Sequence, residues 1–314
     1  MAPHSIKRVF IVGVGRSGTS LLQSMVAAHR QIVMMPETSF VRRYLVGSIF
    51  SKAQQLTSIE IQRDPYIKRW EADHGIELER LHKGTVWAKE FYLSVVNSYA
   101  AKGCINAPEF VGEKDPKMVE NLSHLETIFK DYKVIHIIRD PRDVILSKNK
   151  AEWSKRQSLV KKLVANSSQL RIAELFKKKS PNMMLEVRYE DLISNPEFVL
   201  KDICKFLTID YDPNMLDFQG QANKLIAKDE ISWKRETIGP LLSQNSSKWR
   251  TEMPVETCCL IEACCAKAMT NGGYEKSFRS INCYQRVKIS FFSLCVNFIA
   301  KVYVFKALHL SKAL

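Results

Sequence analysis

Residues 8–38 contain side chains whose types and spacing suit the binding of a phosphate group. An apolar run, Val9–Val12, leads into a loop with three glycines and the cation Arg16, and a helix-like pattern of apolar residues follows at once. In such an order of strand, glycine loop and helix, backbone N–H groups and the positive end of the helix dipole face the anion. The segment therefore predicts a site for a phosphate-containing ligand, with Arg16 as an additional positive charge.

Three interpretations of this loop compete. The spacing from Gly13 to Gly18 matches G-x-G-x-x-G, and Glu37 lies 24 residues after Gly13, close to the place of the ribose-binding acid in dinucleotide folds. A nucleotide triphosphatase loop needs a lysine where this chain has Thr19, so it would lack the charge for the terminal phosphates. In the third interpretation Arg16 is the cation, and backbone N–H groups and hydroxyls hold one phosphate.

A second cluster of polar residues helps to separate these interpretations. Arg139 follows the apolar run Val134–Ile138, and Ser147 comes eight residues later, one or two turns into the next predicted helix. An arginine at a strand end and a hydroxyl near a helix start suit a second phosphate or a similar anion. Nicotinamide enzymes of the common type need no second pair of this kind, whereas a nucleotide with both a 5′ and a 3′ phosphate does.

On these residues the chain resembles the sulfotransferases that use 3′-phosphoadenosine-5′-phosphosulfate (PAPS) as donor. The segment Gly15–Ser20 resembles the 5′-phosphosulfate loop of that superfamily, and Ile138–Asp143 with Ser147 resembles its 3′-phosphate motif. The segment Val187–Leu192 resembles a third motif, whose tyrosine, here Tyr189, reaches the 3′ phosphate.

Within the superfamily, the nearest motif pattern is that of the tyrosylprotein-sulfotransferase type. That type has a histidine thirteen residues after the loop arginine, here His29, and an acid–threonine pair at twenty-one, here Glu37 and Thr38. It also has a Lys-Asp-Pro segment, here Lys114–Pro116, and Ser247–Trp249 resembles the loop that closes over the nucleotide. The resemblance covers most of residues 6–275.

One departure concerns the 3′-phosphate motif. Four residues past the motif serine, where the tyrosyl type has a further arginine, this chain has Ala151, with Lys148 and Lys150 close by.

The sequence also shows no N-terminal anchor or secretory signal, so the resemblance does not imply a protein-tyrosine acceptor. We expect a hydroxyl or amine of a small molecule instead, such as a natural product or glycolipid, in a pocket formed by residues 40–110 and 220–246.

The resemblance implies in-line transfer of a sulfuryl group from PAPS, with PAP as product and with no metal. Negative charge grows on the bridging oxygen, and we expect Arg16 and Lys114 to stabilise it together with backbone N–H groups of the loop. Glu37 is the expected general base for the acceptor's proton. His29 and His136 are expected to be structural. The expected nucleotide-binding residues are Gly15, Arg16, Ser17, Gly18, Thr19, Ser20, Arg139, Ser147, Tyr189, Ser247, Lys248 and Trp249.

Two other function classes remain open from the residues alone. An NAD(P)-dependent oxidoreductase would use the G-x-G-x-x-G-like loop, but it leaves Lys114 and the pair Arg139 and Ser147 without a role. A nucleotide-binding or membrane-associated interaction protein with a decayed site is disfavoured because Arg16, Glu37 and Lys114 are all present.

The chemistry-bearing residues need a scaffold that brings strand ends together. Apolar runs at residues 9–12, 31–35, 134–138 and 184–187 predict strands, and helical patterns lie between them, with residues 40–102 mostly helical. This alternation predicts an α/β fold of the P-loop-like, three-layer kind, with a central, mainly parallel sheet flanked by helices. The ligand is then expected at the carboxyl ends of the strands. We expect a catalytic domain over residues 1–275.

Charge and cysteine content narrow the class of partner and the compartment. The net charge is +14, and residues 276–314 hold seven Lys or Arg and no Asp or Glu. The remaining excess suits an anionic ligand, and the absence of a nucleic-acid-binding module or of interleaved basic and aromatic residues argues against a nucleic-acid partner. Eight scattered cysteines without metal-ligand spacing suggest free thiols in a reducing compartment, so we expect a cytoplasmic protein, either free or peripheral to a membrane.

Residues 276–314 are expected to form a basic, apolar C-terminal helical extension. Over residues 286–310 the polar side chains fall on one narrow stripe of a helix and the other faces are apolar, while Lys301 interrupts the run and disfavours a spanning helix. Three interpretations stay open: packing on the chain's own domain, contact with an anionic membrane surface, and a homodimer contact.

Overall fold

The computed structural model describes residues 6–46, 55–81, 83–102, 108–227, 230–277 and 281–309. A five-stranded sheet forms its centre, with the strand order β2-β5-β1-β6-β7 and every pairing parallel. Its strands are β1 (Lys7–Gly13), β2 (Ile32–Met35), β5 (Phe110–Lys114), β6 (Tyr132–Ile138) and β7 (Met184–Arg188). The prediction of an α/β fold with a parallel central sheet is confirmed.

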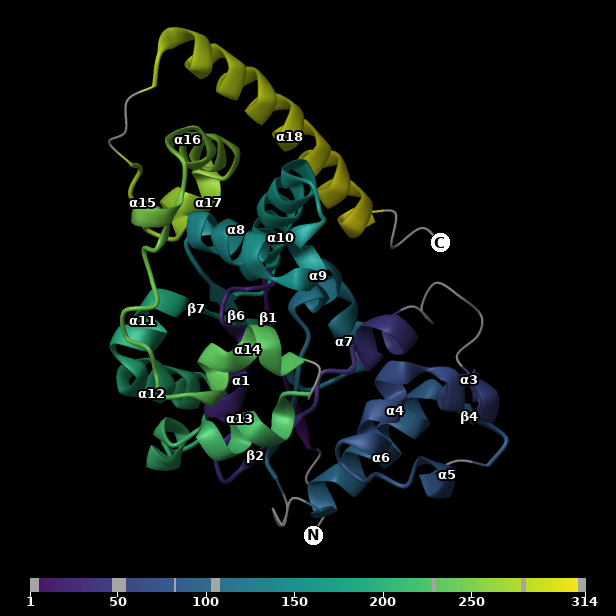
Figure 1. The fold of residues 1–314 in the computed structure, drawn as a ribbon. Coiled ribbons are helices and arrows are strands. Elements are labelled where there is room, and N and C mark those ends of the chain that lie inside the picture. Colours follow the sequence, from purple (N-terminus) through teal and green to yellow (C-terminus); the bar gives the residue numbers. More distant parts are fainter. Residues whose placement is uncertain are drawn as a thin grey trace.

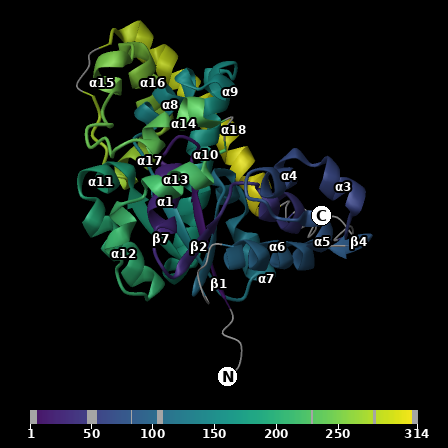
Figure 2. The same ribbon diagram turned by 60° about the horizontal axis from the view of Figure 1, so that its bottom comes forward.

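Each face of the sheet is covered by its own apolar core. On β1, Val9 and Ile11 pack with residues of α1 (Thr19–Ala27) and α12 (Pro196–Leu207), whereas Phe10 and Val12 pack with residues of α6 (Ala88–Lys102) and α7 (Leu125–Ile128). Successive side chains of a strand point to opposite faces, so a continuous apolar run fills both cores. Figure 2 shows α1 and α12 on one side of the strands and α6 and α7 on the other.

The remaining elements between β2 and β7 connect the strands or flank the sheet. Residues 40–102 were expected to be mostly helical, and the structure adds a short antiparallel pair, β3 with β4, among these helices. The elements are η1 (Val41–Val46), β3 (Gln55–Thr57), α3 (Ser58–Arg63), α4 (Pro65–Ala72), α5 (Leu78–Leu81), β4 (Thr85–Trp87), η2 (Pro116–His124), α8 (Pro141–Lys150), α9 (Glu152–Lys155), α10 (Leu159–Lys179) and η3 (Pro181–Met183).

Helix α8 begins earlier than its apolar pattern predicts. The pattern indicates a helical start at Val144, but the helix begins at Pro141 because Asp140 caps it, accepting a hydrogen bond from the backbone N–H of Arg142 at 2.9 Å. A capping carboxylate followed by proline at the first helical position is a strong start signal. This start places the first turn of α8 directly at the end of β6.

The C-terminal third is helical and has a core of its own. Trp249, Ile261, Cys265 and Val296 belong to this third core, which α8 and α10 join to the rest of the domain. The elements after β7 are α11 (Tyr189–Ser194), η4 (Pro213–Leu216), α13 (Gln219–Leu225), α14 (Ile231–Ile238), α15 (Trp249–Glu252), α16 (Val255–Cys264), α17 (Ala266–Asn271) and α18 (Cys283–His309).

The predicted C-terminal helix is α18, drawn in yellow in Figure 1, where it lies across the outside of α10 and α16. Within the described residues it is the one helix long and apolar enough to cross a membrane by length and composition, with a mean hydropathy of 1.6. The seven cysteines that the structure describes are free thiols, and the two on α18, Cys283 and Cys295, are exposed.

Candidate functional site

The glycine loop turns sharply between β1 and α1. Gly18 has φ +95°, and a Cβ atom at this position would lie 2.3 Å from Cδ2 of Tyr189. Arg16 also adopts a left-handed conformation, with φ +79°, which is uncommon for a residue with a side chain and is held by the surrounding structure. The loop therefore has a fixed shape, against which the Tyr189 ring packs.

The N-terminus of α1 faces the cavity with its first-turn amides uncommitted to side-chain caps. Gly18 is the capping residue; among the described residues no side chain caps the helix, and its first turn holds no acid. Thr19 and Ser20 line the cavity at this turn. Orphan N–H groups and the positive end of the helix dipole make such a terminus suited to an anion.

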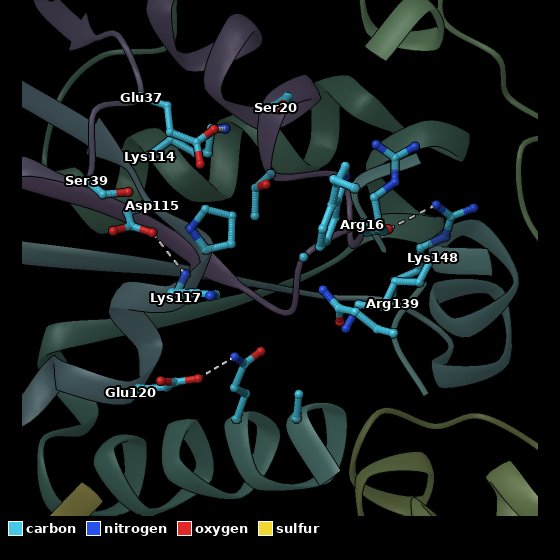
Figure 3. Close-up of a pocket in the computed structure, with 18 of the residues that line it drawn as sticks. Arg16, Ser20, Glu37, Ser39, Lys114, Asp115, Lys117, Glu120, Arg139 and Lys148 are labelled. Carbon is cyan, nitrogen blue, oxygen red and sulfur yellow. Dashed lines mark hydrogen bonds and ion pairs between the residues drawn. The ribbon is translucent and has the colours of Figure 1, made fainter. Parts of the chain in front are cut away.

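The two predicted phosphate clusters meet in space. Arg16 Nε donates to Ser147 Oγ at 3.0 Å, and Arg139 Nη1 donates to the carbonyl oxygen of Arg16 at 3.3 Å. The residues come from the glycine loop, the end of β6 and helix α8, because parallel strands bring their carboxyl ends to one edge of the sheet. Figure 3 shows Arg16, Arg139 and Lys148 at one end of the cavity. The neighbouring Asp140 forms an ion pair with Arg142 at 2.7 Å.

Tyr189 is joined to the same cluster from the other side. The Arg139 guanidinium lies 4.2 Å from the centre of the Tyr189 ring, and Asn245 Nδ2 donates to the Tyr189 hydroxyl at 2.9 Å. Arg139 Nη2 donates to the carbonyl oxygen of Asn245 at 2.9 Å, and Arg139 Nε is buried without a hydrogen-bond partner among the described residues. A buried N–H without a partner costs free energy, so this guanidinium has capacity for an anion.

Glu37 and Lys114 form an ion pair at the other end of the cavity. Glu37 follows β2, Lys114 ends β5, and the Lys114 ammonium donates to Glu37 Oε2. The Lys114 side chain is 2% exposed and that of Glu37 is 24% exposed. Lys234 of α14 joins the pair, with its Nζ 3.4 Å from Glu37 Oε2 and 2.7 Å from Glu230 Oε2.

Electrostatics at this cluster favour the ionised carboxylate. Burial alone would raise the pKa of Glu37, but the charges of Lys114 and Lys234 outweigh it and lower that pKa to about 2. Burial lowers the pKa of Lys114, against the attraction of Glu37. The carboxylate and the lysine therefore hold each other charged in the free protein, because each supplies the opposite charge that burial removes from water.

Arg16, Arg139 and Tyr189 line the same cavity as Glu37 and Lys114, with a volume of about 1020 Å³. Ser147 does not line it and contacts the site through its hydrogen bond with Arg16. One end holds Arg16, Arg139 and Lys148, and the other holds Glu37 and Lys114 (Figure 3). Burial lowers the pKa of Lys148 to about 8. A cavity of this size is at the upper end of small-molecule sites and has room for a nucleotide and a second ligand.

The predicted acceptor regions contribute to the wall. Arg42, Arg43 and Tyr66 come from residues 40–110, and Glu230, Lys234 and Thr237 come from residues 220–246. Two further walls were not predicted: α10 and its capping residue Ser158 contribute a row of residues that ends at Gln169, and α18 contributes Ile299 and Tyr303. Within these two regions, residues 47–54, 82, 103–107 and 228–229 lie outside the described residues.

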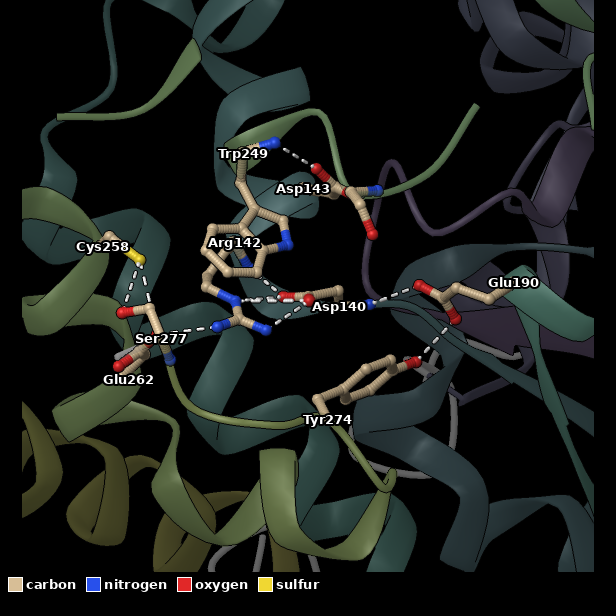
Figure 4. Close-up of polar contacts among 10 residues, drawn as sticks. Asp140, Arg142, Asp143, Glu190, Trp249, Cys258, Glu262, Tyr274 and Ser277 are labelled. Carbon is tan, nitrogen blue, oxygen red and sulfur yellow. Dashed lines mark hydrogen bonds and ion pairs between the residues drawn. The ribbon is translucent and has the colours of Figure 1, made fainter. Parts of the chain in front are cut away.

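A buried polar network lies behind the cavity and ties its motifs to the C-terminal helices (Figure 4). Arg142 pairs with Asp140 and with Glu262 of α16, both at 2.7 Å, and its guanidinium lies 3.5 Å from the centre of the Trp249 ring. Glu190 accepts hydrogen bonds from the backbone N–H of Asp140 at 3.0 Å and from the Tyr274 hydroxyl at 2.9 Å. The first turn of α8 is thus held from two sides.

Ser247–Trp249 lie beside this network and do not line the cavity. Asp143 accepts from the backbone N–H groups of Ser247 at 2.6 Å and of Trp249 at 2.9 Å, and the Trp249 side chain is buried in the third core. The structure therefore places this segment next to the second phosphate cluster, with Asn245 as its point of contact. Gly15, Gly18, Thr19 and Ser20 line the cavity, whereas Ser17 is buried under the loop.

The two histidines singled out from the sequence have structural partners. His29 Nδ1 accepts from the backbone N–H of Gln31 at 3.0 Å, which leaves Nε2 to donate to the carbonyl oxygen of Asp210 at 2.8 Å. His136 Nδ1 lies 3.2 Å from Glu186 Oε2 on the neighbouring strand. Both side chains are buried away from the cavity lining.

Lys234, Asn245 and Lys148 join the candidate site without having been singled out for it. Lys234 and Asn245 belong to segments without a recognisable motif, so no signal in one sequence marks them. Lys148 follows the motif serine directly, and its apolar neighbours on α8 were the available sign that it is buried. Among the described residues no group of three His, Cys, Asp or Glu side chains could hold a metal ion.

Comparison with known proteins agrees with this arrangement. A family model described as "Sulfotransferase family" matches residues 8–213. Protein-tyrosine sulfotransferase 1 of Danio rerio is 24% identical over 264 residues, which cover 79% of this chain and 67% of the relative. The protein-tyrosine sulfotransferase of Drosophila melanogaster is 26% identical over 259 residues, covering 78% of this chain and 47% of the relative. The chain thus spans from about half to two thirds of the length of these relatives.

A solved structure has the same fold. The sulfotransferase domain from the curacin biosynthetic pathway aligns with a TM-score of 0.60 and 20% sequence identity, covering 86% of this chain and 98% of that domain. At this identity the likeness shows the fold alone, a parallel sheet with helices on both faces.

Proposed function

The chain belongs to the sulfotransferase family, and on that premise we propose that it transfers a sulfuryl group from PAPS to a hydroxyl or amine of a small-molecule acceptor, such as a natural product or glycolipid. The observation that carries the proposal is the meeting of the two predicted phosphate clusters at one cavity with the Glu37–Lys114 pair. An NAD(P)-dependent oxidoreductase would leave the second cluster without a ligand.

The nucleotide would be held by the end of the cavity that contains Arg16 and Arg139. The uncapped N-terminus of α1 and the side chain of Arg16 suit the 5′ phosphate group, since both supply N–H donors at the cavity. Arg139, Ser147 and Tyr189 suit the 3′ phosphate, and the unpartnered Nε of Arg139 is a donor that this anion would satisfy. Lys148, buried beside them, supplies the charge that Ala151 lacks.

When bound, PAPS supplies the sulfuryl group and leaves as PAP. Lys114 would then turn from Glu37 toward the transferred group, where negative charge develops. This exchange of partners frees the Glu37 carboxylate to accept the acceptor's proton, and Lys234 remains close enough to position it. The ion pair of the free protein is thus the resting state of a base and a cation that separate during turnover.

The acceptor would lie between Glu37 and the walls formed by α10, α14 and the side chains of Arg42, Arg43 and Tyr66. Several of these cavity-lining cations are already paired, Arg42 with Asp115 at 2.7 Å and Arg43 with Asp64 at 2.6 Å. At Arg42 and Arg43 the wall therefore presents neutralised polar groups, which suit a polar, uncharged part of an acceptor.

The proposal is tested by transfer of radiolabelled sulfate from PAPS across a panel of phenols, alcohols, amines and sugars. We expect labelled product with at least one acceptor, and Glu37→Ala should abolish it while PAP binding stays nearly intact. Glu79→Ala, an exposed acid on α5, is the matched control and should keep full activity. Normal turnover by Glu37→Ala would remove Glu37 as the base, and binding of NAD but not of PAP would favour the oxidoreductase.

A further inference from the structure

Helix α18 packs on the domain through its less apolar face. A surface helix normally turns its apolar stripe toward the core and its polar side chains toward water. In α18 the buried residues are Ser293, Val296, Ala300 and Val304, which face α10 and α16. The packed face is therefore built from small and short side chains.

The opposite face of α18 carries large apolar side chains in solvent. Tyr284 is 77% exposed, Phe291 is 71% exposed and Phe298 is 69% exposed. The exposed row, here called the outer face, consists of Tyr284, Val287, Phe291, Leu294, Phe298, Val302 and Phe305. Their spacing of three and four residues aligns them along one side of a helix about 40 Å long. Contiguous apolar surfaces of this extent mark interaction sites.

Positive charge surrounds the outer face. Lys288 and Lys306 border it on one side and Lys301 on the other, and all three are exposed. From Lys276 to the C-terminus the sequence has seven Lys or Arg and no Asp or Glu. Lysines beside a row of aromatic residues are the pattern of helices that lie in the interface of an anionic bilayer, with the apolar face among the acyl chains and the ammonium groups at the phosphates.

From this arrangement we propose that α18 docks the protein on an anionic lipid surface through its outer face. Docking would bury the aromatic row in the headgroup and acyl boundary while the packed face stays on α10 and α16. The charge distribution favours this occupant over a second copy of the chain. An antiparallel pairing of two outer faces, centred on their middle, would bring Lys288 of one copy near Lys306 of the other, with no acid on either helix to compensate.

The contacts of α18 also favour a helix that lies on the membrane over one that crosses it. The Tyr303 hydroxyl donates to Glu120 of η2 at 2.8 Å, and Val296 is part of the third core. A spanning helix would have to give up these contacts. Lys301, in the middle of the second half of the helix, would also have to enter the hydrocarbon region.

Docking would bring the cavity close to the headgroups. Ile299 and Tyr303, on the flank of α18 between its packed and outer faces, line the cavity that contains Glu37. This step rests on the proposed function: the acceptor would then be a hydroxyl of a lipid headgroup, presented from the membrane plane. Docking itself does not depend on sulfuryl transfer.

The docking test uses the full chain in co-sedimentation with phosphatidylcholine vesicles, with or without phosphatidylserine. We expect binding to the anionic vesicles that weakens with added salt. The double variant Phe291→Ser/Phe298→Ser should bind about tenfold more weakly, and Lys288→Gln/Lys306→Gln should lose the preference for phosphatidylserine. Phe198→Ser, at a phenylalanine on α12 that is 60% exposed, is the matched control and should bind like the unmodified chain.

Three outcomes would overturn the docking proposal. The first is equal vesicle binding by the Phe291→Ser/Phe298→Ser variant and the unmodified chain. The second is a concentration-dependent dimer in sedimentation velocity that this variant abolishes while no vesicles are bound. The third is retention in membranes after carbonate extraction, which would indicate a spanning helix. Circular dichroism of each variant verifies that it is folded.

A separate assay distinguishes docking from the acceptor class. With PAPS present, sulfate transfer to a glycosylated lipid in anionic vesicles should fall in the Phe291→Ser/Phe298→Ser variant by about the same factor as binding. Transfer to a soluble hydroxyl compound should be unchanged. Vesicle binding without transfer to any acceptor would contradict the proposed function and leave docking supported. Transfer to soluble acceptors without vesicle binding would contradict docking and leave the proposed function supported.

Discussion

Glu37 and Lys114 neutralise each other in the free protein, and this has a consequence for the role of each. A carboxylate with a pKa of about 2 is a weak base, and a lysine held by a carboxylate is a poor partner for a developing anion. In the proposed mechanism Glu37 becomes an effective base, and Lys114 an effective partner for the developing anion, only when the two side chains separate. In that mechanism the pair would therefore couple proton removal from the acceptor to the arrival of the donor, because one event would free the residues for both tasks.

The separation of this pair predicts a difference between two pH profiles. In the free protein Glu37 stays ionised down to about pH 2, so kcat/KM for PAPS should show no acid limb from Glu37 near neutrality. Once Lys114 turns away, burial raises the Glu37 pKa toward or above its ordinary 4.5, and kcat should fall as pH drops through that higher value. Steady-state measurements of kcat and of kcat/KM for PAPS between pH 4 and 8 check this difference. If both quantities fell at the same acidic pH, the result would contradict the movement of Lys114 away from Glu37.

At the scale of the elements, the glycine loop and α11 form one unit, because Gly18 leaves room for the ring of Tyr189. Gly18→Ala should destabilise the protein by about 1–3 kcal/mol, through the positive φ and the overlap with Tyr189. Gly84→Ala is the matched control: it has φ +68° but nothing within 4 Å of the added carbon, so it reports the backbone cost alone. Urea unfolding of both variants measures the difference, and equal losses would show that the ring contact has no energetic role.

Asp143 connects α8 to the segment that contains Asn245 and Trp249. Asp143→Asn keeps the shape of the side chain but removes one of its two acceptor oxygens, so the segment from 245 to 249 should loosen. Because Asn245 holds Arg139, we expect PAP affinity to fall by about tenfold. Calorimetric titration with PAP measures this, with Asp217→Asn, an exposed acid, as control. Unchanged affinity would mean that Arg139 keeps its position without this segment.

At the scale of the whole molecule, the cavity is lined by residues at the carboxyl ends of the sheet strands and by residues of α10 and α18. Nucleotide binding there should therefore stabilise the entire domain. At PAP concentrations about a hundredfold above Kd, binding contributes about 2.7 kcal/mol, which corresponds to a rise of several degrees in Tm. Thermal unfolding with and without PAP checks this rise. The rise should be much smaller in Arg139→Ala and unchanged in Lys7→Ala, a lysine at the opposite end of β1. An equal rise in Arg139→Ala would exclude Arg139 from the nucleotide site.

Much of this molecule could be predicted from its sequence, because its strands and anion-binding residues form local patterns. The parallel sheet, the α/β class and the family were all confirmed, and Arg16, Glu37, Lys114, Arg139 and Tyr189 do line one cavity. Strand β5 was missed because its second half is Gly-Glu-Lys, which breaks the apolar run. The carboxyl of Glu113 is buried there, and burial raises its pKa to about 7.

The remaining misses have a common physical reason. The strands β3 and β4 have three residues each, too short for an alternating pattern. Lys234 reaches Glu37 from a helix nearly two hundred residues away in the chain, and α18 reaches the cavity by tertiary packing alone. Such contacts depend on how elements pack, and no local pattern records them. The roles of the individual site residues stay predictions.

The positions of the free thiols allow a fluorescent label to be attached to α18 in the unmodified sequence, so that the surroundings of this helix can be measured. Burial raises the pKa of Cys204 to about 11 and that of Cys264 to about 12, which keeps both as unreactive thiols at neutral pH. Cys283 and Cys295 are the two exposed thiols among the cysteines that the structure describes. Among the described cysteines, a polarity-sensitive fluorophore coupled under limiting reagent would therefore label α18 first, where its emission reports whether that helix is in water or in lipid.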